Sequence, residues 1–234
     1  MRSPLVKCAF ILIALAAACN APDKQEAGTQ AAPGSADADR ALVHHPEPPS
    51  RPSEKQDSIP MEGMFNRITA KLVQPDAEPR FSTYVPEGML YEPNSSDEGD
   101  GHFFFTNFAG KRNNNAYMVV FIYPVGTTEA GARRTVESFV SSRKAVERAR
   151  EGGPRYKEAL LERDFTFEQN GVRMLGSIAL GKHGNRYFHL AHQYPAEYSE
   201  GFGPRAWYIR QQWVWLDDGQ GLGLTSPPLP GSPR

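Results

Sequence analysis

Cysteine is nearly absent from this 234-residue chain, and its two copies, Cys8 and Cys19, both lie within the first twenty residues. The remaining residues therefore offer no disulfide, no cysteine-ligated metal site and no thiol nucleophile. Excess charge is lacking too, because 26 basic and 27 acidic side chains give a net charge of -1. This balance excludes the strongly positive surface that is typical of nucleic-acid-binding proteins.

Motifs of several enzyme classes are also missing. The chain has no Gly-x-Ser-x-Gly nucleophile motif and no glycine-rich phosphate loop. A transmembrane helix needs about 20 consecutive apolar residues. The longest apolar run, CAFILIALAAA over residues 8–18, is too short to span a bilayer.

This short apolar run belongs to an export signal. Arg2 and Lys7 precede it, and a basic start followed by a short apolar segment is typical of a secretory signal peptide. We therefore predict a signal peptide over residues 1–18. The alternative, a buried N-terminal helix, would show a polar stripe that this run lacks.

The end of the run carries a second signal. Leu15-Ala16-Ala17-Ala18-Cys19 resembles the lipobox of bacterial lipoproteins, which implies that Cys19 is diacylated and anchors the protein in a membrane. Residue 20 is Asn rather than the Asp that commonly retains enteric lipoproteins in the inner membrane, so the resemblance implies the outer membrane. Ala16-x-Ala18 also fits an ordinary signal-peptidase site, and a secreted protein without lipid remains the alternative.

A tether is expected between the anchor and the folded domain. Residues 19–59 are rich in Pro and Ala, contain no aromatic side chain and mix both charge signs. Such a segment buries too little apolar surface to offset its chain entropy, so we predict disorder. The adjacent His44 and His45 offer no preformed metal-binding geometry there. A single domain is expected over residues 60–225, followed by a loose Pro-rich tail over 226–234.

The pattern of the domain predicts an α+β fold. Met61, Met64, Phe65, Ile68 and Leu72 fall at helical spacing, and an apolar stripe predicts a long amphipathic helix over residues 128–151 that Thr127 or Thr128 caps. Runs rich in aromatic and β-branched residues predict strands over 81–85, 102–108, 117–123, 165–169, 172–180, 186–194 and 206–216.

These elements give the order β-β-β-α-β-β-β-β after the short first helix. We expect a mainly antiparallel sheet of six to seven strands with the long helix packed on one face. Asn170-Gly171 predicts a tight hairpin turn, because this dipeptide tolerates positive φ angles. Trp213 and Trp215 share one face of the expected last strand, which we place beneath the long helix.

The start of the first predicted strand carries a family resemblance. Phe81-Ser82-Thr83-Tyr84-Val85-Pro86-Glu87-Gly88-Met89, together with the element order, is similar to the PsbP-like family of thylakoid-lumen and bacterial envelope proteins. The similarity covers about residues 80–217. It implies an assembly or accessory factor without a catalytic centre, and it transfers no functional residue to this chain. The chain departs from the family because no helix is predicted after the last strand.

Histidines are the candidates for catalysis. A metal-dependent or serine hydrolase would use His102, His189 or His192 with nearby carboxylates. His189 and His192 are three residues apart in a predicted strand, which sends them to opposite faces and prevents them from sharing a metal. Residues 97–101 (DEGDG) lack the spacing of a calcium-binding loop, so we expect a solvated turn there.

One loop is a candidate binding surface. Gly and Pro frame the aromatic residues of segment 194–205, and we expect Tyr198, Phe202 and Arg205 to contact a partner. In the alternative, Tyr198 and Phe202 only fix the loop to the sheet. The sequence thus predicts a non-enzymatic, outer-membrane-anchored lipoprotein that binds an envelope protein or small ligand, without metal, cofactor or nucleic acid.

Overall fold

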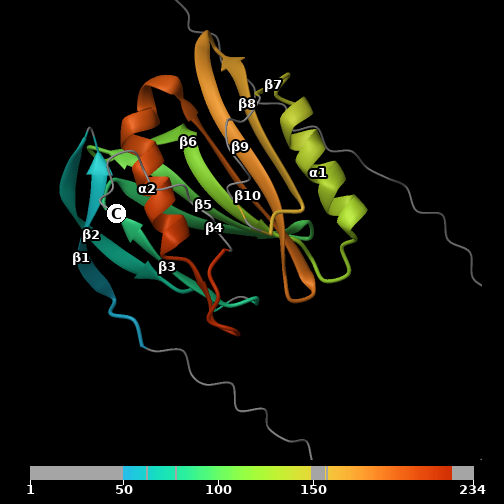
Figure 1. Ribbon diagram of the computed structural model, residues 1–234, viewed down its shortest axis with the longest axis horizontal. Coiled ribbons are helices and arrows are strands. Elements are labelled where there is room, and N and C mark those ends of the chain that lie inside the picture. Colours follow the sequence, from blue (N-terminus) through green and yellow to red (C-terminus); the bar gives the residue numbers. More distant parts are fainter. Residues whose placement is uncertain (1–49, 62, 77, 149–155, 157, 223–234) are drawn as a thin grey trace, which may run out of the picture. The chain divides into compact units, whose positions relative to one another are not determined.

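The structure is a computed structural model that describes residues 50–61, 63–76, 78–148, 156 and 158–222. The predicted signal peptide, Cys19, most of the tether and the tail at 226–234 lie outside these residues. Two antiparallel sheets and two helices of 13 residues make up the described domain (Figure 1). Neither helix has the length and apolar character needed to cross a membrane.

The larger sheet has seven strands in the order β4-β5-β6-β10-β9-β8-β7, and the smaller has four in the order β1-β2-β3-β11. The strands and helices are β1 (Glu54–Met61), β2 (Met64–Val73), β3 (Phe81–Pro86), β4 (Met89–Ser96), β5 (Gly99–Phe108), β6 (Lys111–Ile122), α1 (Glu129–Ser141), β7 (Val146–Arg148), β8 (Leu161–Gln169), β9 (Val172–His183), β10 (Arg186–Pro195), the 3₁₀ turn η1 (Ala196–Tyr198), α2 (Ser199–Gln211) and β11 (Val214–Trp215). The predicted α+β class with mainly antiparallel pairing is confirmed. The expected single sheet of six to seven strands is instead eleven strands in two sheets.

The first hairpin corrects the predicted N-terminal helix. β1 and β2 pair from Glu54↔Lys71 to Met61↔Met64. Burial in β2 alternates, with Ile68 and Ala70 on the buried face, which is the period of a strand. The spacing of the apolar residues also fitted a helix because the run is short, and short apolar runs are ambiguous between the two. Strand β1 also includes residues 54–59, which were expected in the tether.

The long helix is real but shorter than predicted. α1 begins after Thr128, whose side chain accepts a hydrogen bond from the Gly131 N–H, so the predicted cap is confirmed. Ala132, Val136 and Val140 form its buried stripe. The helix ends at Ser141 rather than near residue 151, because the chain turns through Lys144 at φ 51° and continues as β7.

The C-terminal segment corrects the predicted last strand. Residues 199–211 form α2, and only Val214 and Trp215 form a strand, β11, which pairs with β3. The segment contains Gly201, Gly203 and Pro204, which have low helix propensity. The sequence pattern therefore does not predict α2. Phe202, Ala206 and Ile209 are all buried and recur at helical spacing. A helix thus follows the last long strand, contrary to the expectation.

The two helices cover opposite faces of the seven-stranded sheet (Figure 1). On one face, α1 packs with Val119, Ile178 and Ala191. The core on the other face combines α2, Trp213 and Trp215 with Val120 and Leu190. The prediction that the tryptophans lie beneath the long helix is therefore wrong, because they belong to the core under α2.

Two predicted turns are confirmed. Asn170 and Gly171 have φ angles of 53° and 76° and join β8 to β9 as a tight hairpin. Of the predicted turn over residues 97–101, Asp97 and Glu98 form the turn between β4 and β5, whereas residues 99–101 belong to β5. Strand β4, which contains Pro93, was not predicted.

Candidate functional site

The three candidate histidines all lie in the interior. His102 on β5 is 3% exposed, and His189 and His192 on β10 are 6% and 9% exposed. The Tyr91 hydroxyl lies 2.9 Å from His102 Nδ1, and the Tyr123 hydroxyl lies 2.8 Å from His189 Nδ1. The expectation that His189 and His192 occupy opposite faces is confirmed, because His189 stacks on Phe121 beneath α1, whereas the ring of His192 lies 6.2 Å from that of Phe202 in α2.

Burial changes the acid–base chemistry of two of these histidines. Desolvation lowers the pKa of His102 to about 4, although the charge of Asp100 opposes the shift. Desolvation and the charge of Arg143 lower the pKa of His189 to about 3. Both rings are therefore neutral near pH 7 and hydrogen-bonded to tyrosines. Groups with these pKa values are weak general bases, and neither ring lines the cavity described below.

The expected binding loop forms η1 and the first half of α2. Phe202 is fully buried, and its ring lies 4.8 Å from that of Tyr194. Tyr198 stacks on Phe108 at 6.0 Å. Arg205 donates hydrogen bonds to the backbone oxygens of Glu87 and Gly201. These contacts pack the segment against the neighbouring strands, whereas Tyr198 and Arg205 stay partly exposed. A role of this segment in binding a partner stays a prediction.

A cavity of about 150 Å³ lies beside the end of β9. Its wall is mixed. The apolar side chains that line it are Ala159, Ala179, Leu180, Phe188, Leu190, Trp215 and Leu222. Tyr156, Glu158, Lys182, His183 and Gln220 add polar groups. Apolar surface combined with polar groups that fix orientation is typical of sites that bind small molecules.

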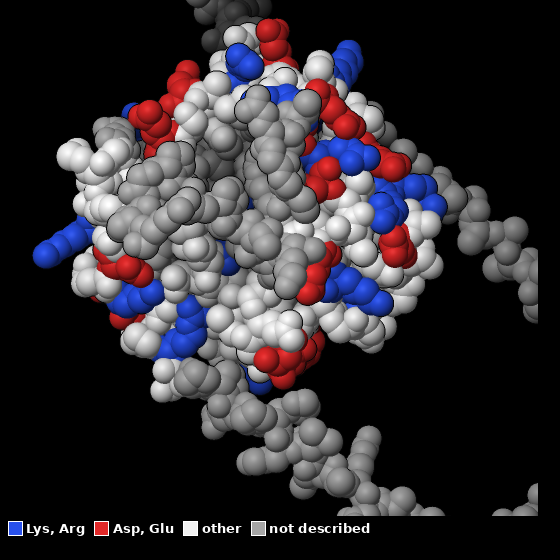
Figure 2. Space-filling model, viewed as in Figure 1, with Lys and Arg blue, Asp and Glu red and all other residues white. Residues whose placement is uncertain are grey.

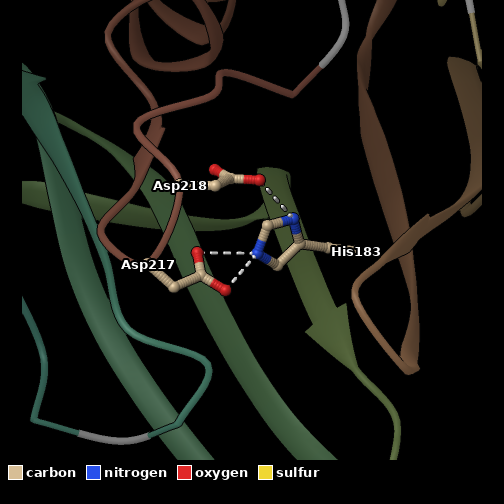
Figure 3. Close-up of side chains that lie close together, drawn as sticks. All are labelled: His183, Asp217 and Asp218. Carbon is tan, nitrogen blue, oxygen red and sulfur yellow. Dashed lines mark hydrogen bonds and ion pairs between the residues drawn. The ribbon is translucent and has the colours of Figure 1, made fainter. Parts of the chain in front are cut away.

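Three polar side chains, His183, Asp217 and Asp218, converge, and His183 also lines the cavity (Figure 3). His183 Nε2 lies 2.8 Å from both carboxylate oxygens of Asp217, and His183 Nδ1 lies 3.7 Å from Asp218 Oδ2. The imidazole stacks on the indole of Trp215, with ring centroids 4.3 Å apart and an interplanar angle of 8°. One aromatic side chain therefore supports the polar cluster and also lines the cavity.

A closed turn presents the two aspartates. The Trp215 N–H donates to the Gln220 oxygen at 2.7 Å, and the Gly219 N–H donates to the Trp215 oxygen at 2.9 Å. Gly219 has a φ of 72°, a conformation that side chains disfavour. The Leu216 N–H donates to the Arg80 oxygen, which ties the turn to the start of β3. These hydrogen bonds thus fix the backbone of the turn that carries both aspartates.

The sequence did not reveal His183, Asp217 or Asp218 as site residues. His183 is followed by Gly-Asn and was assigned to a turn, while the aspartates follow the segment that was expected to be one long strand. The contact between His183 and Asp217 joins residues 34 positions apart, and no local pattern predicts such a contact. The one available signal is the aromatic residue, Trp215, just ahead of an Asp-Asp-Gly turn.

The surface shows the charge balance expected from composition. Among the described residues that Figure 2 shows, basic and acidic side chains are intermixed, and neither sign forms a continuous patch. Long-range electrostatic attraction of a charged partner to this face is therefore weak.

Comparisons with known proteins find similarity of structure alone. No protein-family model matches the chain, and no curated protein matches it. A crystal structure of LpqN, described as involved in cell envelope biogenesis of Mycobacterium tuberculosis, is similar over 68% of this chain and 90% of that chain, with 10% identity and a TM-score of 0.36. A solution structure of cyanobacterial PsbP (CyanoP) from Synechocystis covers 61% of this chain and 91% of that chain, with 9% identity and a TM-score of 0.34.

Proposed function

We propose that this protein is a non-enzymatic lipoprotein of the cell envelope whose tethered domain binds a small apolar ligand. In this proposal lipid on Cys19 anchors the chain in the outer membrane, and the residues before the domain form the tether. The signal-like residues 1–18 and the lipobox-like Leu15-Ala16-Ala17-Ala18-Cys19 support the anchor. The tether gives the domain reach away from the membrane surface.

The cavity beside β9 is the observation that carries the binding function. Its volume of about 150 Å³ is enough for a ligand the size of benzene, and part of its wall is apolar. Trp215 and Phe188 offer aromatic surface, and Leu190 and Leu222 offer aliphatic surface. We therefore assign the ligand to small apolar molecules, or to the apolar end of an envelope amphiphile. The burial of His102, His189 and His192 supports binding over hydrolysis.

Toluene titration of the mature protein tests this function. Trp215 lines the cavity, so its indole N–H resonance is expected to shift saturably as toluene is added, whereas the resonance of Trp207, which does not line it, is expected to stay in place. Ala159→Phe fills the cavity and is expected to abolish the shift of the Trp215 resonance.

Ala145→Phe provides the matched control. Ala145 packs in the core under α1, on the other face of the large sheet, so the same substitution there adds the same atoms away from the cavity. This variant is expected to bind toluene like the parent protein. A shift that survives in Ala159→Phe, or no saturable shift in the parent protein, would contradict the assignment of the cavity as the binding site.

The intact mass of the mature protein tests the anchor. Protein extracted with detergent from its native host is expected to have the mass of residues 19–234 plus a diacylglyceryl group, with or without an N-linked acyl chain. Cys19→Ser removes the sulfur atom to which the diacylglyceryl group would be attached. This variant is expected to be released from membranes. The bare polypeptide mass in the parent protein would instead establish a secreted protein without lipid.

A further inference from the structure

The cluster of His183, Asp217 and Asp218 carries a second inference (Figure 3). We propose that these three side chains bind a divalent metal ion of the zinc class at the rim of the cavity. The site is independent of whether the cavity accepts an apolar ligand. It was not expected from the sequence, which predicted no metal.

The charges of the cluster favour a cation. Asp217 faces Nε2 of the imidazole and Asp218 faces Nδ1. A neutral imidazole has a single N–H, so it donates to one carboxylate and turns a lone pair toward the other. Within the described part of the chain, neither aspartate forms a salt bridge with a lysine or arginine. Two carboxylates therefore share one imidazole, and a divalent ion would neutralise the excess negative charge.

The geometry suits a small transition-metal ion. Each residue offers one donor atom, and these three atoms all lie within 4.8 Å of one another. Zinc takes imidazole nitrogen and carboxylate oxygen at about 2.0–2.2 Å. Because Asp217 faces Nε2 and Asp218 faces Nδ1, at least one aspartate side chain rotates when all three donors reach one ion. Three protein ligands leave at least one position for water or for a polar group of a bound ligand.

Contacts within the protein restrict two of the donors, His183 and Asp218, before any ion binds. The imidazole is stacked on Trp215 and sits at the end of β9, where His183 pairs with Arg186 of β10. Asp218 accepts a hydrogen bond from the Gln220 N–H on Oδ1, which leaves Oδ2 facing the imidazole. Because hydrogen-bonding and aromatic contacts already restrict these side chains, less conformational entropy is lost when they bind an ion.

The donor set selects the class of ion. Calcium and magnesium prefer sites made entirely of oxygen donors. An imidazole nitrogen with two carboxylates suits zinc and its neighbours nickel and cobalt, and no thiolate is present to favour copper(I). The exposed position of Asp217, whose side chain is 51% accessible, lets an ion enter from solvent.

Isothermal titration of the detergent-solubilised mature protein with ZnCl₂ tests the site. His44→Gln and His45→Gln are introduced first, because these adjacent imidazoles offer competing ligands. One zinc ion is expected to bind per chain, and each of Asp217→Asn and Asp218→Asn is expected to weaken binding at least tenfold. Co²⁺ is expected to quench tryptophan fluorescence, because the imidazole that ligates it stacks on Trp215.

Two further variants separate a metal site from a change in folding. His183→Phe keeps an aromatic ring against Trp215 but removes the nitrogen ligand, so it is expected to abolish both zinc binding and Co²⁺ quenching. Asp97→Asn makes the same exchange as Asp217→Asn in the turn between β4 and β5, and is expected to bind zinc like the parent protein. The proposal is overturned by the absence of zinc binding at millimolar concentration, or by binding that persists in His183→Phe and Asp217→Asn. Toluene binding without zinc binding would remove this site and leave the proposed function intact.

Discussion

Trp213→Ala is expected to lower the free energy of unfolding by about 3–5 kcal/mol, as is typical when a large aromatic side chain is removed from a core. Trp213 is 0% exposed, and its ring stacks on Phe81 with centroids 3.8 Å apart. It also meets Trp215 edge-on at 5.3 Å. The substitution therefore leaves a cavity between α2 and β3 that rigid neighbours fill poorly. Urea unfolding followed by circular dichroism measures the change.

Trp213→Phe is the control for this prediction. The indole Nε1 of Trp213 is buried and has no hydrogen-bond partner among the described residues. Phenylalanine removes this unsatisfied donor while keeping a ring against Phe81, so its loss of stability is expected to be less than half of that caused by alanine. Equal losses in the two variants, or an unchanged midpoint for Trp213→Ala, would show that the indole does not pack in the core.

Acid is expected to unfold the protein through His102 and His189. Burial lowers their pKa values from the ordinary 6.5 to about 4 and about 3, so the unfolded chain takes up protons that the folded chain excludes. The contribution of these two histidines to the free energy of unfolding is fully present above pH 6.5 and is lost as the pH falls toward 4. Each histidine contributes a slope of about 1.4 kcal/mol per pH unit, and together they give about 2.7 kcal/mol per unit. Urea unfolding at pH 7.5, 6, 5 and 4 measures the slope.

Asparagine variants isolate the contribution of these histidines from that of carboxylates. Asparagine places an amide near the position of Nδ1, so His102→Asn and His189→Asn keep a partner for Tyr91 and Tyr123. Each variant is expected to remove about half of the extra slope between pH 6 and 4. Parallel profiles for the parent protein and both variants would mean that the two rings accept protons in the folded state.

Much of the fold follows from local sequence patterns. The stripe of Ala132, Val136 and Val140 and the cap at Thr128 identify α1, because both signals lie within the helix itself. Asn170-Gly171 identifies the β8–β9 hairpin for the same reason. The antiparallel α+β class is confirmed by these elements and by the long aromatic strands β5, β6 and β10.

The errors arise where local preference and tertiary packing disagree. α2 forms despite Gly201, Gly203 and Pro204, because its Phe202 and Ile209 are buried in the core of the large sheet. The sequence pattern predicts a helix for part of the β1–β2 hairpin, because the few apolar residues there fit the helical period as well as the strand period. Packing against Tyr84 and Tyr208, which lie far along the chain, settles the strand conformation.

The candidate site was beyond sequence reasoning for a different reason. His183 and Asp217 meet only because the turn after β11 returns to the end of β9. The predicted candidates Tyr198, Phe202 and Arg205 were chosen for residue type in a Gly- and Pro-rich segment. Phe202 is buried in the core, whereas Tyr198 and Arg205 are partly exposed, and residue type alone does not predict this difference.

The chain enters the domain through a clamp at Arg51. Its guanidinium donates to Ser82 Oγ at 2.7 Å and to the Gln212 oxygen at 2.9 Å, and lies 4.5 Å from the centre of the Tyr84 ring. β1 is the edge strand of the smaller sheet. Tension applied at its N-terminal end would break its hydrogen bonds to β2 one after another. In a lipid-anchored protein, a pull from the membrane reaches Arg51 first, and the clamp transmits that load to β3 and the end of α2. Tension on the chain ahead of Arg51 would thus be shared by β3 and the end of α2 and would not act on the edge strand β1 alone.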